Sequence, residues 1–280
     1  MDETNEAQAE FWAQAGEMWT KLREQFDAQA GDHGTAAIDA LAPQPGESII
    51  DIGCGAGSST IDIAGRVAPG GGVLGFDISP TMIEGARALA EASGASNARF
   101  AVGDAMVEPF EPSFDGAYSR FGVMFFSDAV RGFGNIRTAL KPGGRLAFVC
   151  WQSPMVNEWV SVPLSVMGQH VDLPFGADPT APGPFSLSDP DRLASVVGDA
   201  GFEDVTIEGV ELGAFLGETT DEAIDFLFGL MPVAAALRAD DPATADVVAA
   251  ELAERFEPWK TDAGIEAPSA TGIVTARSNS

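Results

Sequence analysis

The stretch Ser48-Ile49-Ile50-Asp51-Ile52-Gly53-Cys54-Gly55-Ala56-Gly57 decides the fold of this 280-residue chain. Its apolar first half is typical of a buried strand, and its glycines give a turn whose bare backbone can approach a ligand closely. The next residues, 58–64, have the pattern of a helix. A strand, a glycine turn and a helix in this order form the unit with which open α/β sheets hold a nucleotide-like ligand.

The spacing of the glycines separates several nucleotide-binding motifs. Gly53, Gly55 and Gly57 are spaced G-x-G-x-G, whereas the dinucleotide fingerprint is G-x-G-x-x-G. A phosphate-binding P-loop would need a lysine where Ser58 stands. Asp51 would also put a carboxylate beside a pyrophosphate, and these like charges repel. The loop therefore favours a cationic or zwitterionic ligand.

Two further acids follow predicted strands in the same way. Asp77 comes after the apolar run 73–76, and Asp104 comes after the run 100–103. Each acid is expected just past the carboxyl end of its strand, at the edge where this type of sheet binds ligands. A single such acid could equally be a strand-end cap or a solvated turn residue. Three acids in register favour a binding site.

Together these pieces resemble a class I S-adenosylmethionine-dependent methyltransferase. The resemblance spans residues 47–151 and includes the Leu-Lys-Pro-Gly-Gly-Arg-Leu turn at 140–146, which in that family enters the fifth strand. Beyond this core, segments 11–27, 119–126 and 273–277 look like a large bacterial subgroup whose members mostly carry no assigned substrate. The resemblance therefore implies S-adenosylmethionine as the donor and leaves the acceptor open.

The resemblance also implies a role for each motif. The glycine loop approaches the methionine part of the cofactor, the acid after the second strand takes the ribose hydroxyls, and the acid after the third strand meets the adenine amino group. A carboxylate that accepts two hydroxyl protons selects a ribose, so Asp77 is the most informative position. No metal is expected. The residues implied in cofactor binding are Asp51, Gly53, Cys54, Gly55, Gly57, Asp77, Ile78, Asp104, Ala105, Ser119 and Arg120.

The expected fold is α/β, with a Rossmann-like, mostly parallel sheet of seven strands, helices on both faces, a helical cap and a last strand that the resemblance makes antiparallel. Alternating strands and helices imply parallel pairing with right-handed crossovers. One compact domain is expected, with N-terminal helices or a lid at 1–45, a cofactor core at 46–151, a cap at 152–188 and the rest of the sheet at 189–280. The expected strands are 48–52, 72–76, 98–102, 114–118, 145–151, about 205–212 and about 272–277. The expected helices are 58–68, 80–93, 128–140, a helix from 189 that stops at 201, 219–237 and 243–256.

Two helices are expected before the first strand. An amphipathic helix runs from Asn5 to Asp27, and a short helix runs from Thr35 to Leu41. The aromatic stripe of the first helix either packs on the core or also closes over the active site through Trp12 or Trp19. His33, in Gly31-Asp32-His33-Gly34, is expected in the entry loop before the first strand.

The acceptor pocket is expected at the end of the fourth strand, Tyr118-Ser119-Arg120-Phe121. This segment lacks the Asn-Pro-Pro-aromatic motif of enzymes that methylate exocyclic or amide nitrogens of nucleic acids and proteins, which argues against those substrates. Aromatic and thioether side chains suit a partly apolar small molecule, or an amine held by cation–π contact. The accepting atom, oxygen, nitrogen, carbon or sulfur, stays open. The residues expected to border the pocket are Trp12, Trp19, Phe121, Met124, Phe125, Trp151, Met155 and Trp159.

Methyl transfer from a sulfonium is an in-line displacement, so catalysis consists mostly of positioning. A hydroxyl or a protonated amine would still benefit from a general base. The candidates that act on the acceptor are His170, His33 and Arg120, with His170 preferred because it lies in the expected cap. Arg120 could instead pair with an acid of the protein itself, and the surplus of acids favours this second role.

Charge and composition narrow the partners. With 42 acidic and 15 basic residues the net charge is -27, which repels phosphate backbones and anionic lipids. We therefore expect a small-molecule acceptor, no nucleic acid and no membrane. The acidic N-terminus lacks a secretory pattern and the two cysteines form no disulfide framework, so a cytoplasmic monomer or homodimer is expected. The acidity fits either a high-salt habitat or an ordinary acidic enzyme.

Two alternative functions stay open from the residues alone. One is a nicotinamide-dependent oxidoreductase on a similar sheet, and the other is a non-catalytic regulator that binds S-adenosylmethionine. Thermal stabilisation by NAD and none by S-adenosylhomocysteine would indicate the oxidoreductase.

Overall fold

A computed structural model describes residues 8, 10–12, 16, 19–173 and 178–279 of the chain. These residues form an eight-stranded sheet in the order β3-β2-β1-β4-β5-β8-β6, with β7 paired to β8 alone. The first five strands are parallel, while β8 is antiparallel to both β5 and β6. The predicted fold class is confirmed, and the short β7 is the addition to the seven expected strands. The strands are β1 (Ser48–Ile52), β2 (Gly72–Asp77), β3 (Ala98–Val102), β4 (Phe114–Arg120), β5 (Leu140–Trp151), β6 (Phe202–Gly217), β7 (Lys260–Thr261) and β8 (Gly264–Ser278).

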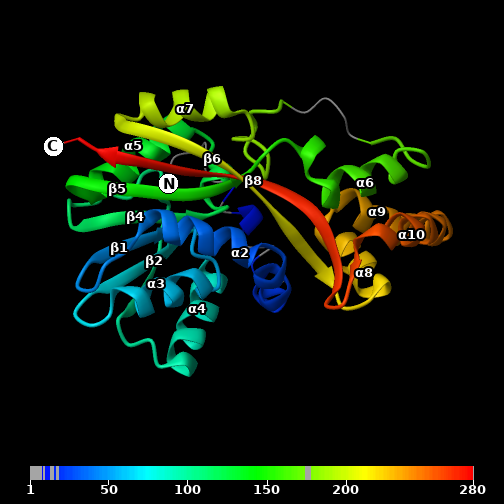
Figure 1. The fold of residues 1–280 in the computed structure, drawn as a ribbon, viewed down its shortest axis with the longest axis horizontal. Helices are drawn as coiled ribbons and strands as arrows, with labels where there is room; N and C mark the ends of the chain where they lie inside the picture. Colours follow the sequence, from blue (N-terminus) through cyan, green and yellow to red (C-terminus); the bar gives the residue numbers. More distant parts are fainter. Residues whose placement is uncertain (1–7, 9, 13–15, 17–18, 174–177, 280) are drawn as a thin grey trace.

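Helices cover both faces of the sheet. Helices α2, α3 and α4 lie on one face, and α5 and α7 lie on the other (Figure 1). The α-helices are α2 (Arg23–Leu41), α3 (Ser58–Val67), α4 (Pro80–Ser93), α5 (Ala129–Ala139), α6 (Glu158–Met167), α7 (Pro190–Asp199), α8 (Thr220–Leu230), α9 (Pro232–Asp240) and α10 (Pro242–Arg255). Single turns of 3-10 helix are η1 (Val123–Phe125), η2 (Pro154–Val156) and η3 (Glu257–Trp259).

Several helix boundaries follow directly from local sequence. The Ser79 side chain accepts a hydrogen bond from the Met82 N–H, and Pro80 takes the first helical position of α4. Asp189 caps α7 in the same way through the Arg192 N–H. These two starts were predicted correctly, because a cap needs only residues that are close in sequence.

The prediction of two helices before the first strand was wrong at its second helix. Helix α2 runs without a break through Gly31 and Gly34. A Cβ atom on Gly34 would lie 2.5 Å from Cδ of Arg120 and 3.2 Å from the hydroxyl of Tyr118. The glycine thus serves the close approach of α2 to β4 rather than a loop. Part of the predicted helix 5–27 lies outside the described residues, and α2 itself begins at Arg23.

The end of the chain builds a second layer of structure beyond the parallel strands. Trp151, the last residue of β5, pairs with Thr271, and β6 and β8 continue as an antiparallel pair past this point to Gly217 and Ile265. Helices α6, α8, α9 and α10 pack around this extension, and we call this part the lobe (Figure 1). Both β6 and β8 are longer than predicted. The predicted helix 219–237 is divided, because Pro232 has no N–H to continue α8.

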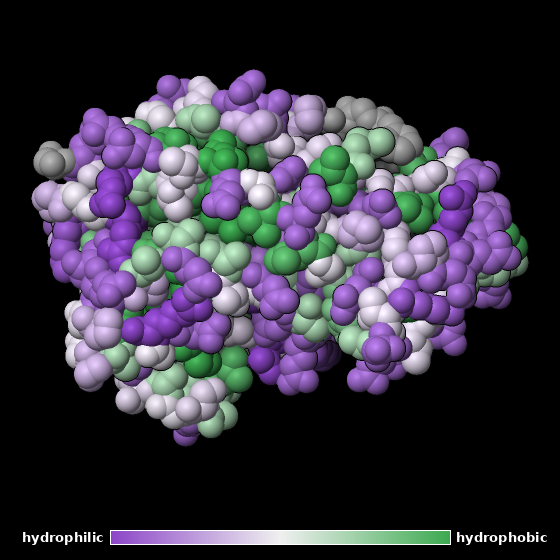
Figure 2. All heavy atoms as spheres, in the orientation of Figure 1, coloured by the Kyte–Doolittle hydropathy of each residue, from purple (hydrophilic) through white to green (hydrophobic). Residues whose placement is uncertain are grey.

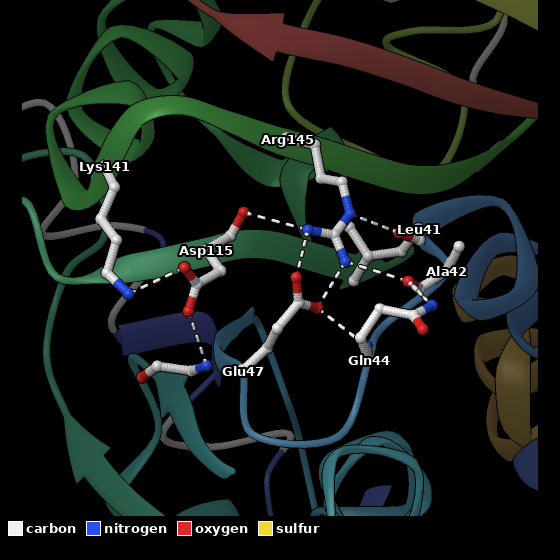
Figure 3. A network of polar contacts seen from close by, with 8 residues as sticks. Leu41, Ala42, Gln44, Glu47, Asp115, Lys141 and Arg145 are labelled. Carbon is white, nitrogen blue, oxygen red and sulfur yellow. Dashed lines mark hydrogen bonds and ion pairs between the residues drawn. The ribbon is translucent and has the colours of Figure 1, made fainter.

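A network of hydrogen bonds and ion pairs lies at the amino ends of the parallel strands (Figure 3). Arg145 of β5 donates to both carboxylate oxygens of Glu47 and to the carbonyl oxygens of Leu41 and Ala42. The hydrogen bond from Arg145 lowers the pKa of Glu47, against the effect of burial. Asp115 of β4 accepts hydrogen bonds from Lys141 and the Ser48 N–H. These contacts fix the end of α2 and the start of β1.

The surface is polar over most of the face seen in Figure 2. Hydrophobic atoms gather in the middle of that face, where β6 and β8 pass from the sheet to the lobe (Figures 1 and 2). Within the described ranges, every helix is too short or too polar to cross a membrane.

Candidate functional site

Three buried acids meet at the carboxyl edge of the sheet. Asp51 is the last residue but one of β1, Asp77 ends β2, and Asp104 follows β3, and these residues are 0%, 8% and 5% exposed. Strand β2 lies between β1 and β3 and runs parallel to both. The three carboxylates therefore share one edge of the sheet.

The loop after β1 is held in a conformation that favours glycine. Gly53, Gly55 and Gly57 have φ values of 66°, 55° and 91°, in the left-handed region that L-residues adopt at a cost. The N–H of Gly55 donates to Oδ2 of Asp77 at 2.9 Å, and the N–H of Ser79 donates to Oδ1 at 2.8 Å. Asp77 thus fixes the glycine loop against the turn after β2. Burial raises its pKa, while these backbone hydrogen bonds lower it.

Asp51 has one satisfied and one free carboxylate oxygen. Its Oδ2 accepts hydrogen bonds from the hydroxyls of Ser59 and Thr60, both at 2.7 Å. Its Oδ1 is buried and has no partner among the described residues. Burial raises the pKa of Asp51 to about 6, and the two hydroxyls act in the opposite direction.

Two more buried oxygens at this edge have no partner in the described part of the chain. They are Oδ2 of Asp104, whose Oδ1 accepts from the Met106 N–H at 2.9 Å, and Oγ of Ser119 on β4. A buried acceptor without a donor costs free energy, so these atoms need a partner that the described residues do not supply. The edge therefore fits a ligand with cationic or N–H groups, which an ammonium and an adenine amino group would supply.

The N-terminal segment lies against the same edge. The Ser79 hydroxyl donates to the carbonyl oxygen of Trp12 at 3.2 Å. A Cβ atom on Gly16 would lie 2.7 Å from the Ser79 hydroxyl oxygen, so the backbone passes close to the turn after β2. The Trp12 ring packs edge-on against Phe125 of η1 at 4.9 Å and against Trp19 at 5.5 Å.

Arg120, at the end of β4, pairs with an acid of the protein. Its Nη2 lies 2.6 Å from Oδ1 of Asp27, whose Oδ2 accepts a hydrogen bond from the Ser58 hydroxyl at 2.6 Å. Asp27 therefore joins α2 to β4 and to the first residue of α3. Burial disfavours the charged guanidinium, but Asp27 holds the pKa of Arg120 above its ordinary value. Of the two roles expected for Arg120, the structure shows the internal ion pair.

His33 lies inside α2, and its placement in a loop was wrong. The side chain is 1% exposed, and its ring nitrogens lie 2.8 Å from the hydroxyls of Ser269 and Thr271 on β8. Because Ser269 donates its own proton to the Leu212 carbonyl, Nε2 of His33 donates to Ser269 and Nδ1 accepts from Thr271. Burial lowers the pKa of His33 to about 4. Both nitrogens are occupied, so His33 is a neutral cross-link between α2 and β8.

Aromatic rings form two groups near the carboxyl edge. In the first, Phe121 stacks on Trp151 at 4.4 Å, and Trp151 contacts Trp159 at 5.0 Å and His33 at 5.6 Å. In the second, Trp19 stacks on Phe26 of α2 at 3.7 Å, and Phe26 contacts Phe226 of α8 in the lobe at 5.6 Å. The sequence pattern does not show that α2 and α8 approach each other.

The remaining residues that the sequence analysis expects at the site lie in different parts of the fold. His170 bonds to Glu251 of α10 at 3.1 Å, on the lobe rather than at the edge of the sheet. Met155 is 77% exposed on η2, which removes it from an enclosed pocket. Met124 is buried in the core, where its carbonyl accepts from Gly183 and Ser186. Residues at the edge of the sheet that stay buried or half-buried are Cys54, Ile78 and Ala105.

Sequence reasoning missed two polar residues of α2 at this edge, Asp27 and Gln29. Asp27 ends the aromatic stripe of the N-terminal segment, and no local pattern marks it as the partner of Arg120, which lies 93 positions away. Gln29 is 4% exposed, and no local pattern marks it.

Comparison with known proteins gives one consistent family. Residues 49–144 match the family model described as "Methyltransferase domain". The aklanonic acid methyltransferase DauC of Streptomyces sp. (strain C5) is 39% identical over 116 residues, covering 41% of this chain and 53% of that protein. The nocamycin O-methyltransferase of Saccharothrix syringae is 27% identical over 257 residues, covering 86% of this chain and 88% of that protein. A phosphoethanolamine N-methyltransferase 2 of Haemonchus contortus, solved with S-adenosyl-L-methionine, shares the fold with a TM-score of 0.54 at 20% identity, covering 89% of this chain and 53% of that one.

Proposed function

This chain belongs to the class I S-adenosylmethionine-dependent methyltransferases, and we propose that it transfers a methyl group to a planar, partly apolar small molecule. The donor follows from the family, and S-adenosylmethionine supplies an electrophilic methyl group when it is bound. The matches above give no support to a nicotinamide-dependent oxidoreductase. A soluble, cytoplasmic monomer or homodimer that binds no nucleic acid is part of the proposal, in keeping with the net charge of -27.

One observation supports the donor site most strongly. Asp51 and Asp104 each keep one buried carboxylate oxygen without a partner in the described residues, beside a glycine loop that Asp77 fixes. In the proposed complex, Asp51 and the loop hold the methionine part, Asp77 takes the ribose hydroxyls, and Asp104 takes the adenine amino group. Ile78 and Ala105 then border the adenine, and Ser119 adds a hydroxyl at the end of β4.

The acceptor site in this proposal is bordered by the Phe121, Trp151 and Trp159 rings, with Trp12, Trp19 and Phe125 as the cover on the other side. Helices α2 and α6 would shield the acceptor from water. Relatives named as methyltransferases of aklanonic acid and nocamycin act on small molecules, which favours the same substrate class here. An oxygen, nitrogen or carbon nucleophile is compatible with this site.

Catalysis in this proposal depends on position rather than on a histidine base. His33 uses both ring nitrogens within the protein, and His170 bonds to Glu251 on the lobe. Arg120 is paired with Asp27. In this proposal it therefore contributes to the shape and the charge of the carboxyl edge of the sheet. Placing the acceptor in line with the methyl group then supplies most of the rate enhancement.

A melting screen tests the proposal. The full chain is heated with S-adenosylmethionine, S-adenosylhomocysteine or NAD, and the first two should raise Tm by several degrees at concentrations about a hundredfold above Kd. A rise with NAD alone contradicts the proposal. A panel of oxygenated aromatic acceptors with mass detection then separates turnover from binding, since a non-catalytic regulator would show the shift and no methylated product.

A further inference from the structure

Gln29 has a buried amide nitrogen that the described part of the chain does not use. It is 4% exposed on α2, and its Nε2 atom has no hydrogen-bond partner among the described residues. Leaving an amide donor buried and unpaired is unfavourable, and an apolar side chain of the same size would pack there without that cost. An unused donor at this depth is consistent with a ligand group that completes its hydrogen bond.

Its neighbours on α2 show which part of the molecule Gln29 faces. Phe26 precedes it by three residues and His33 follows it by four, so all three lie on one face of the helix. Phe26 contacts Trp19 and Phe226, whereas His33 contacts Trp151 and β8. Gln29 therefore lies on α2 between Phe26, which contacts Phe226 of the lobe, and His33, which contacts Trp151 of the sheet.

The position of Gln29 along α2 places it level with the carboxyl edge of the sheet. Gly34 packs against Tyr118 within β4, while Asp27 reaches the tip of Arg120 at the end of β4. Gln29 lies between these two levels on the side of the helix that faces Trp151 rather than Arg120. The donor-binding acids lie on the other strands of the same edge, so Gln29 belongs to the acceptor side.

We propose that Gln29 selects the acceptor: its Nε2–H donates a hydrogen bond to an oxygen carried by a planar aromatic molecule held between the two aromatic groups. This inference rests on the proposed methyl transfer and specifies its acceptor class. Hydroxyl, carbonyl and carboxylate oxygens on fused rings all accept such a bond, and the flat rings of Phe121 and Trp151 match the ring system. A ring without oxygen would leave the amide unpaired.

The test compares the full-length protein with Gln29→Met, which keeps the length of the side chain and removes the amide. The probes are 2-hydroxy-1,4-naphthoquinone and naphthalene, which share one ring skeleton, and binding is measured by equilibrium dialysis with S-adenosylhomocysteine present. Wild type should prefer the naphthoquinone. Gln29→Met should reduce that preference about tenfold and leave naphthalene binding unchanged. Gln169→Met, the same change at an exposed position of the lobe, should behave as wild type.

Two further measurements, the Tm of Gln29→Met and the melting shift with S-adenosylhomocysteine, separate a ligand-binding role of Gln29 from a structural role and from a failure of the proposed function. If Gln29 is reserved for a ligand, Gln29→Met should melt at the same temperature as wild type or higher, because it buries no unpaired amide. A lower Tm together with an unchanged preference would show a purely structural role and overturn the inference, as would a wild type that binds both probes equally. The melting shift with S-adenosylhomocysteine reports on the donor site alone, so its absence contradicts the proposed function and is separate from any result on Gln29.

Discussion

Gly53 and Gly122 pack against each other backbone to backbone. A Cβ atom on Gly53 would lie 2.9 Å from Cα of Gly122, and a Cβ atom on Gly122 would lie 2.9 Å from Cα of Gly53. The contact joins the loop after β1 to the turn after β4, where Phe121 is held at a φ of 58°. The glycine loop and the turn that carries Phe121, at the border of the proposed acceptor site, therefore share one point of contact.

Gly53→Ala should consequently disturb both halves of the site. The substitution combines a left-handed φ of 66° with a clash against backbone, and together these should lower the free energy of unfolding by about 3 kcal/mol. Urea unfolding with and without S-adenosylhomocysteine measures this loss. The matched control is Gly65→Ala in α3, where the added Cβ meets no atom within 4 Å and should stabilise the helix by about 0.5 to 1 kcal/mol. Equal stability of the two variants would show that the contact is unimportant.

Asp77→Ala should remove most of the stabilisation given by the cofactor. Its oxygens already accept from the Gly55 and Ser79 N–H groups, and each retains a lone pair for a ribose hydroxyl. The loss should be about 2 to 3 kcal/mol of binding free energy, measured as the melting shift with S-adenosylhomocysteine. Asp246→Ala, on an exposed position of α10, serves as the control. An unchanged shift in Asp77→Ala would place the ribose elsewhere.

The strands, the glycine loop and the positions of the acids at the strand ends could be predicted from sequence because their signals are local. The glycine loop, the acids that follow the strands and the Ser79-Pro80 helix start all depend on residues within a few positions of one another. The error at α2 has the opposite cause. Gly34 looks like a helix breaker, yet its role is set by Tyr118, whose hydroxyl donates to the Gly34 carbonyl from 84 positions away.

The surroundings of the residues expected around the acceptor were harder to predict for the same reason. Whether Met155 is exposed and Gln29 is buried depends on the antiparallel pairing of β6 with β8, which positions the lobe and joins residues as far apart as Phe202 and Ser278. Composition suggested an aromatic pocket, and the rings do gather at the edge of the sheet. Their division into two groups on either side of α2 follows only from long-range pairing.

Asp51 should make cofactor binding dependent on pH. Its pKa is raised to about 6 by burial, and a cationic ligand group requires the ionised carboxylate. Affinity for S-adenosylhomocysteine should therefore be constant above pH 7 and weaken up to about tenfold for each unit below pH 6. Calorimetric titration from pH 8 to pH 5 measures this. Asp51→Asn should bind more weakly with little pH dependence, and a wild-type profile as flat as that of the variant argues against the role of Asp51.

His33 should destabilise the protein as the pH falls. Its pKa is about 4 in the folded protein and 6.5 when unfolded, so between these values the unfolded chain binds a proton that the folded chain does not. The contribution of His33 to the free energy of unfolding is fully present above pH 6.5 and is lost as the pH falls towards 4. The loss is about 2 kcal/mol between pH 7 and pH 5. The nearby carboxylate of Asp32 acts to raise the pKa, and burial outweighs it.

The measurement is the difference in pH dependence between wild type and His33→Gln, taken from urea unfolding at pH 7 and pH 5. Glutamine keeps a donor and an acceptor for Ser269 and Thr271 but does not titrate. The raised pKa values of Asp51 and Asp77 act with the opposite sign in part of this range, and they cancel because both proteins contain these acids. Wild type should lose about 2 kcal/mol more than the variant. Parallel pH profiles would mean that the His33 side chain takes up its proton as readily in the folded protein as in the unfolded chain.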